Sequence, residues 1–461
     1  MTTVPERDAW KALAALVIGF FMILVDQTIV AVATEAFVTQ LGATPNQVIW
    51  VTSAYLLAYV VPLLFTGRLG DQIGPRAVSI AGLAVFTGAS LWCGLAPDIE
   101  TLIVARVFQG FGAALLTPQS LSVITRVFAP ARRGAAMGTW GAVAGIASVV
   151  GPVFGGVLID AFDWRWIFFV NIPFGVLAVI LVWRWVPALE TRSRSYDIPG
   201  ILLSGLGMFL LVFGIQQGES HGWGGTTVAL IVAGLVGLGL FVWWQSRVRV
   251  EPLVPLRLFR DRNFAIGTFG VSTIGFVTAG TMVPLMFYLQ GVKELSPTAA
   301  GLMLLPMALV AGVLAPLVGR WADRLDPRIF TGVGYFSYAV SLFWLALVMD
   351  SQTSIPMLIG PIALMGVANG CVWAPTSSTA MRRLELASAG AGSGVYNTTR
   401  QVGAVLGSAA IGALMQTRLV LHGDIGQAVA DAMFLPAVVV LAGGLATMAF
   451  RTDASAVSAS R

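Results

Sequence analysis

The sequence predicts an all-α polytopic membrane protein with 14 transmembrane helices, arranged as six, plus two, plus six. Three observations support this: a low share of charged residues, fourteen long apolar runs, and one loop sequence that occurs twice. Of the 461 residues only 11% are charged and 57% are hydrophobic, and the mean hydropathy is +0.84. Because soluble proteins carry about 25% charged residues, this chain needs a lipid-facing surface.

The apolar runs are long enough to span a bilayer. A helix needs about 20 apolar residues to cross the hydrocarbon core, where every backbone amide must bond within the helix. The first run contains an acid and is too long for a signal peptide, so it is read as a retained span. The runs lie near 11–33, 47–66, 77–96, 101–124, 138–159, 166–186, 198–217, 226–245, 264–289, 299–318, 329–349, 355–377, 393–415 and 432–450.

The basic residues predict the orientation. With the N-terminus inside, 22 of the 27 Lys and Arg residues fall on cytoplasmic segments and three, Arg165, Lys293 and Arg418, fall outside. This is the bias of the positive-inside rule, so we expect both termini in the cytoplasm and the chain in the inner (cytoplasmic) membrane. The net charge of +5 suits an anionic lipid leaflet and gives no reason to expect nucleic-acid binding.

One loop sequence is repeated, which indicates an internal duplication. Residues 67–76 and 319–328 are identical at five of ten positions, and both follow a span that runs inward. The copies lie 252 residues apart, whereas six spans need only about 180 residues, so two additional spans separate the halves. We therefore expect a six-helix bundle at 1–190, two inserted helices with linkers at 191–262, and a second six-helix bundle at 263–461.

Several strings resemble motifs of the major facilitator superfamily. The loop 67–76 resembles its signature loop, and 106–114 resembles the fourth-span motif whose arginine is linked to proton coupling. The string 151–156 resembles the fifth-span antiporter motif, and 164–173 fits the same branch. Residues 25–35 resemble the first-span motif of the fourteen-span drug:proton antiporter branch, the EmrB- and QacA-type exporters, although Ala31 and Glu35 replace its usual asparagine and proline.

The resemblance implies roles for two sets of residues. The first set would form a conformational latch in which glycines let helices approach and charges link them: Gly67, Arg68, Asp71, Arg76 and, in the second copy, Asp323. The second set belongs to the antiporter motif, where glycines permit close packing and proline removes a backbone donor and bends the helix: Gly151, Pro152, Gly155 and Gly156. This motif favours export over import.

Two charges inside spans are candidates for proton coupling. Asp26 is the only carboxylate well inside a span, and burying an unpaired carboxylate costs about 2–3 kcal/mol. Such a group loads and unloads a proton as a cavity opens alternately to each side; the other interpretation is a bond to neighbouring helices. Arg106 cannot lose its proton, so it needs a carboxylate, carbonyl oxygens or water, or it snorkels to the outer interface.

Four further polar residues are candidates for the lining of a central cavity: Gln109, Asn397, Arg400 and Glu35. Arg400 also fits a structural contact between helices, and Glu35 fits a solvated position at the headgroups. Five aromatic residues fit either an apolar pocket or ordinary packing: Trp50, Tyr55, Phe287, Tyr288 and Trp373.

Other classes of protein find little support. Cys93 and Cys371 lack the spacing of a metal or redox site and are expected to be buried, and the glycine-rich 234–239 is expected to pack helices. No Walker loop is present, so we expect no cofactor, no metal and no enzyme activity, with the proton gradient as the energy source.

The sequence therefore predicts a proton-coupled antiporter that exports small, largely apolar or amphipathic compounds. Its expected partners are a small-molecule substrate, protons and the lipid bilayer, and one chain supplies a complete path. A dedicated exporter or symporter of one metabolite, lipid or siderophore remains open, because the same fold serves all of these functions. A membrane-embedded enzyme is the alternative of another class, but only His221 and His422 are available to it.

Overall fold

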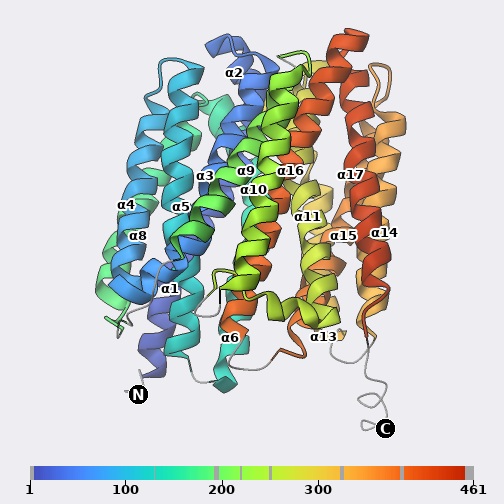
Figure 1. Ribbon diagram of the computed structural model, residues 1–461. Helices are drawn as coiled ribbons and strands as arrows, with labels where there is room; N and C mark the ends of the chain where they lie inside the picture. Colours follow the sequence, from blue (N-terminus) through green and yellow to red (C-terminus); the bar gives the residue numbers. More distant parts are fainter. Residues whose placement is uncertain are drawn as a thin grey trace. The chain divides into compact units, whose positions relative to one another are not determined.

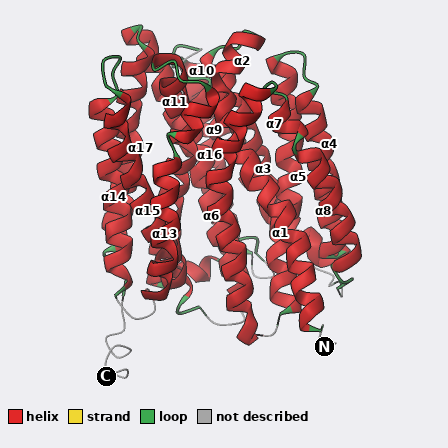
Figure 2. Ribbon diagram, turned by 180° about the vertical axis from the view of Figure 1, so that it is seen from behind, coloured by secondary structure: helices red, strands yellow, loops and turns green. Residues whose placement is uncertain are grey.

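The computed structural model describes residues 5–128, 130–189, 191, 197–218, 221–248, 252–321, 326–384 and 389–451. In these ranges the chain forms helices and loops and no strand, as Figure 2 shows. The prediction of an all-α membrane protein is confirmed. The chain divides into two compact units, which are described separately.

The first unit runs to Ile215 and also includes Trp223–Leu253 and Ser296–Gly301, so both inserted helices group with the N-terminal bundle. Its helices, shown from blue to green in Figure 1, are α1 (Glu6–Ile29), η1 (Val30–Ala33), α2 (Thr34–Leu41), α3 (Pro45–Ile73), α4 (Pro75–Gly94), α5 (Ile99–Val127), α6 (Pro130–Ala161), α7 (Trp166–Phe169), α8 (Asn171–Trp185), α9 (Ile198–Gln216) and α10 (Gly225–Arg247).

The second unit covers Gln216–Gly222, Val254–Leu295 and the chain from Leu302 onward. The short α12 (Pro297–Leu302) falls almost wholly in the first unit. The helices of the second unit are η2 (Leu256–Arg260), α11 (Arg262–Met286), the π-helical η3 (Phe287–Val292), α13 (Leu305–Trp321), α14 (Pro327–Val348), α15 (Ile355–Met381), α16 (Ala389–His422) and α17 (Ile425–Thr447).

Local sequence signals explain where several helices begin and end. Thr44 and Gln47 form a capping box at the start of α3, and the Asp98 carboxylate accepts from Thr101 N at the start of α5. Proline is the first residue of α3, α4 and α14, where its missing N–H costs nothing. Gly74 ends α3 at φ 100°, a conformation that favours glycine, and α4 begins directly after it.

Thirteen helices in the described part are long and apolar enough to cross a membrane. The one predicted run outside these thirteen, 138–159, corresponds to α6. This helix is 32 residues long, and its described apolar portion is Val150–Ala161. Several boundaries differ from the prediction; α3 extends to Ile73, for example, and the run at 299–318 is divided between α12 and α13. The first helical segment continues to Leu41, and the run at 166–186 is divided at Val170 into α7 and α8. Hydropathy locates apolar stretches and does not register a local change of helix geometry.

The inserted helices pack on each other through glycines, as predicted for 234–239. A Cβ at Gly234 would lie 2.5 Å from Leu211 N, and one at Gly207 would lie 2.9 Å from Leu238 N. Figure 1 shows α9 and α10 side by side. Small residues at these points let the two backbones approach, which is how helices associate in lipid.

Candidate functional site

A buried ion pair lies inside the first unit. Asp26, on α1, has no exposed surface, and Arg106, on α5, is 1% exposed. Arg106 Nη1 donates to Asp26 Oδ2 at 2.5 Å. Of the two interpretations that the sequence left open for Asp26, the bond to a neighbouring helix is present, because a cation 80 residues away in the sequence neutralises the carboxylate. Snorkelling of Arg106 is excluded by the same contact.

Three amide or guanidinium groups donate to the Asp26 carboxylate. Gln109 Nε2 donates to Asp26 Oδ1 at 2.8 Å, and Asn171 Nδ2 donates to the same oxygen at 3.1 Å. Both amides also donate to Ser90 Oγ, at 2.8 Å from Gln109 and 3.4 Å from Asn171. All the donors to Asp26 are N–H groups, and one of them, the Arg106 guanidinium, carries the charge that balances the carboxylate.

Arg106 is held on the other side by backbone and aromatic groups. Its Nε donates to the carbonyl oxygen of Val51 at 3.1 Å, and its Nη1 donates to Gln109 Oε1 at 2.6 Å. The guanidinium lies 4.1 Å from the centroid of the Tyr55 ring, a cation–π contact. Tyr55 is itself fully buried, and its ring packs against the arginine.

Two glycines bring α5 close enough for these contacts. A Cβ at Gly110 would lie 2.2 Å from the carbonyl oxygen of Tyr55 on α3, and one at Gly112 would lie 2.6 Å from Phe86 N on α4. Arg106 and Gln109 lie one helical turn before these glycines. Because the two residues are three positions apart, their side chains share a face of α5. The fourth-span motif thus combines the charged group with the residues that allow its helix to pack.

The network includes two residues, Asn171 and Ser90, that were not predicted to belong to a site. Asn171 and Ser90 are 3% and 0% exposed, and each is an uncharged polar residue within a long apolar run. That isolation is the sequence signal that points to them, because a buried amide in a membrane helix needs a partner. Gln109, a candidate for the lining of a cavity, is fully buried and belongs to this network.

Residues 67–76, which were predicted as a loop, are helical except for Gly74, because α3 continues to Ile73 and α4 begins at Pro75. Gly70 leaves room for α5, since a Cβ there would overlap the side-chain oxygen of Gln119. Gln119 Nε2 donates to Thr66 O at 2.8 Å, and Arg76 Nη2 donates to the carbonyl oxygen of Trp183 on α8. Arg68 is 8% exposed. The residue named for the second copy of the latch, Asp323, lies outside the described residues.

The glycines of 151–156 lie against two other segments of the first unit. A Cβ at Gly151 would collide with Thr28 Oγ1, and one at Gly155 would lie 2.4 Å from Ile29 Cγ1, both on α1. A Cβ at Gly156 would lie 2.4 Å from the carbonyl oxygen of Pro297. The helix α6 continues through Pro152. These positions therefore fix how closely α6 approaches α1, the helix that carries Asp26.

The remaining candidate residues have contacts of their own. Glu35 is partly exposed on α2, beyond the end of α1. Asn397 and Arg400 belong to the second unit, where Asn397 Nδ2 donates to the carbonyl oxygen of Ser393 in its own helix, at 3.1 Å. The Arg400 guanidinium lies 6.0 Å from the ring centroid of Trp373.

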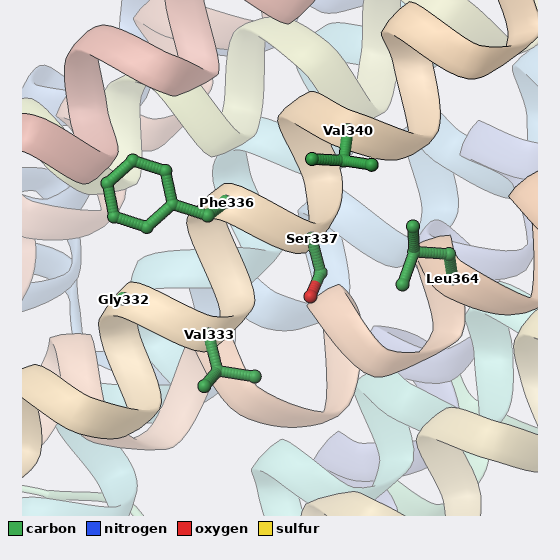
Figure 3. A pocket seen from close by; sticks show the side chains of 6 residues that line it. All are labelled: Gly332, Val333, Phe336, Ser337, Val340 and Leu364. Atoms are coloured by element: carbon green, nitrogen blue, oxygen red, sulfur yellow. The ribbon is translucent and has the colours of Figure 1, made fainter.

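A surface pocket in the second unit is lined by residues that cannot take up or release a proton. It measures about 400 Å³ and, as Figure 3 shows, is lined by side chains of α14 and one of α15: Gly332, Val333, Phe336, Ser337, Val340 and Leu364. None of these residues is ionisable. Across the described residues no three His, Cys, Asp or Glu side chains gather as a metal site, and Cys93 and Cys371 are free and buried, as expected.

A bundle of apolar helices with a neutralised ion pair in its interior is the architecture of a multi-pass membrane protein. The model of the Major Facilitator Superfamily matches residues 16–408, and the chain belongs to that family. The family match shows that this membrane protein is a transporter and not an enzyme. The prediction from its motifs is confirmed.

Relatives and solved structures agree with this assignment. The chain is 49% identical to an uncharacterized MFS-type transporter of Mycobacterium tuberculosis, over 90% of this chain and 71% of the relative. It is 34% identical to the tetracenomycin C resistance and export protein of Streptomyces glaucescens, over 90% and 77%. A POT family transporter in complex with 5-aminolevulinic acid has a TM-score of 0.70 at 14% identity, over 96% of this chain and 97% of that one, and shows the fold alone.

Proposed function

We propose that this transporter exports small, largely apolar or amphipathic compounds across the cytoplasmic membrane in exchange for protons. The observation that carries the proposal is the buried pair of Asp26 and Arg106. Among the relatives, the tetracenomycin C export protein and the multidrug resistance protein Stp of Mycobacterium tuberculosis, 32% identical over 89% of this chain and 76% of the relative, support export of drug-like compounds.

Protonation of Asp26 is the coupling step in this proposal. A neutral Asp26 no longer balances Arg106, and an unbalanced guanidinium in a low-dielectric interior is costly, so α1 and α5 must rearrange or admit water. Release of the proton restores the pair. The bundle thus alternates between two states according to the charge on one carboxylate, which is the requirement for driving transport with a proton gradient.

The other sequence features take supporting roles in the proposal. Gly67, Arg68, Asp71, Arg76 and Asp323 latch one state, and Gly151, Pro152, Gly155 and Gly156 set the approach of α6. Both termini are cytoplasmic, one chain is the functional unit, and the proton gradient is the energy source without a cofactor. Glu35, Asn397 and Arg400 remain candidates for contacts with the substrate or a second proton.

Everted membrane vesicles loaded with acid test the proposal. Ethidium added outside should enter the vesicles and release luminal protons, which a pH-sensitive dye inside the vesicles reports. Vesicles that carry Asp26→Asn should show neither movement. If a broad panel of cationic and neutral dyes releases no protons from wild-type vesicles, multidrug antiport is wrong.

A dedicated transporter of one metabolite is the second candidate. The chain is 30% identical to the riboflavin transporter RibZ of Clostridioides difficile, over 87% of both chains, so substrates outside the drug class occur among its relatives. Uptake of radiolabelled riboflavin into cells and into everted vesicles separates the two candidates. Riboflavin movement without movement of any dye favours the dedicated transporter.

A further inference from the structure

A second buried carboxylate lies at the start of the inserted helices. Asp197 precedes α9 and is 8% exposed. Its Oδ1 accepts from Gly200 N at 3.0 Å and from Trp244 Nε1 at 2.7 Å, and its Oδ2 accepts from Gln245 Nε2 at 2.6 Å. Trp244 and Gln245 lie near the end of α10. One carboxylate therefore joins the beginning of one inserted helix to the end of the other.

The site is built to hold a carboxylate. A Cβ at Gly200 would lie 2.3 Å from Asp197 Oδ2 and 2.6 Å from Gln245 Nε2, so a larger residue would displace both groups. Burial alone raises the pKa of Asp197, but the donors from Gln245, Trp244 and Gly200, together with the positive charge of Arg68, hold that pKa below its usual value. Arg68 lies near the end of α3, is one of the two arginines of residues 67–76, and is equally buried.

Beyond Asp197, the inserted helix α9 also packs against α3. Phe213 on α9 lies 5.7 Å from Trp50 on α3, measured between ring centroids, and a Cβ at Gly205 would lie 3.0 Å from Val61 Cγ1. Apolar contacts therefore run along α9 and α3, and they move toward the C-terminal end of α3, which carries Arg68, as α9 is followed back to Asp197. Apolar contacts alone would allow α9 to slide along α3, whereas a charge pair fixes its position.

We propose that Asp197 is a positioning residue that holds Arg68 and fastens the inserted helices to the end of α3. In this arrangement the two additional helices act as part of the first unit, and they set the positions of residues 67–76 at the junction of α3 and α4. The role goes beyond the cap that Asp197 provides for α9, because a cap requires only an oxygen acceptor and the pairing requires a negative charge.

Asp197→Asn separates the two roles. Asparagine keeps an oxygen for Gly200 N and Trp244 Nε1, and its amide can donate to Gln245 if the Gln245 side-chain amide turns over, so only the charge is lost. The variants to compare are Asp197→Asn, Arg68→Gln and the double variant, with Asp98→Asn as the matched control. Asp98 also caps a helix, with Thr101 N at 2.7 Å from its Oδ1, but its side chain is exposed.

Hydrogen–deuterium exchange of the purified proteins in nanodiscs provides a measurement that needs no substrate. Amides of 66–76 should exchange about tenfold faster than in the wild type in each single variant, which is the scale of one lost charge-assisted contact. The double variant should exchange no faster than either single variant. The Asp98→Asn control should leave this segment unchanged. Wild-type exchange in Asp197→Asn, or effects that add in the double variant, would overturn the proposal.

Ethidium transport in everted vesicles supplies a second measurement, which rests on the proposed function. Asp197→Asn should lower the maximal rate several-fold and leave the KM for ethidium unchanged, since Asp197 positions a helix and does not bind substrate. A raised KM with an unchanged maximal rate would contradict a positioning role. If wild-type protein moves no dye, the proposed function fails, and the exchange measurement still decides the role of Asp197.

Discussion

Asp26 on α1 and Arg106 on α5 neutralise each other in the interior of the first unit, with 2.5 Å between Oδ2 and Nη1. Neither charge reaches the surface, so each depends on the other for its stability. Removing one partner of a buried pair costs about 3–5 kcal/mol, whereas removing both costs much less. This difference separates the structural role of the pair from its role in transport.

Asp26→Asn should abolish proton-driven efflux of ethidium, since the amide cannot take up a proton at physiological pH. Efflux in everted vesicles under an imposed pH gradient measures the effect, and an immunoblot of the membranes confirms expression. Asp8→Asn is the matched control, because Asp8 lies on the same helix and pairs with Lys11 at the surface. Wild-type coupling in Asp26→Asn would contradict the mechanism.

The double variant Asp26→Asn, Arg106→Gln should recover the free energy of unfolding that the single variant loses, but it should not recover transport. The single variant leaves Arg106 buried and unbalanced and should lower stability by about 3–5 kcal/mol. The double variant removes both charges. Denaturant titration of the detergent-solubilised proteins compares the two, and a double variant as unstable as the single one would show that the neighbouring donors matter more than the charge.

Arg106→Lys should also impair efflux, although it keeps the charge. Lysine lacks the planar fork that reaches both Asp26 and Val51 O, and it stacks less well on Tyr55. We expect a lower maximal rate for Arg106→Lys and no transport for Arg106→Ala. Normal ethidium efflux by Arg106→Ala would remove this residue from the coupling step.

Asn171→Ala should destabilise the protein by about 1.5–3 kcal/mol, the usual value of a hydrogen bond to a charged group. The change removes the bond from Asn171 Nδ2 to the charged Asp26 Oδ1 and a longer bond to Ser90 Oγ. Thr125→Ala serves as the control, because the Thr125 hydroxyl bonds only to carbonyl oxygens of its own helix, α5. Equal unfolding midpoints for the two variants would show that Asn171 contributes no more than an ordinary helix surface residue.

Gly155→Val should separate α6 from α1 and reduce transport, because its side chain would occupy the space of Ile29. A Cβ at Gly239 on α10 would meet no atom within 4 Å, so the same change there should be tolerated. Efflux rates at matched expression compare the two variants. If both behave alike, the antiporter motif has no special packing role in this chain.

The sequence by itself determined the class of this protein and most of its helices. Hydropathy is additive along the chain, so the low charged fraction and the length of each apolar run fix the spans without knowledge of their neighbours. The repeated loop and the motif around Arg106 were also enough to identify the family. Asp26 and Arg106 could each be singled out, because a charge inside an apolar run is conspicuous.

Only the tertiary structure decided that these charges form a pair and that Gln109, Ser90 and Asn171 surround them. Their helices are far apart in sequence, and helix packing depends on shape at contacts such as Gly110 against Tyr55, which no periodicity reveals. The same holds for Asp197, whose partners lie 47 and 48 residues away on α10. Composition indicates that a buried charge needs a partner, and the fold selects which residue provides it.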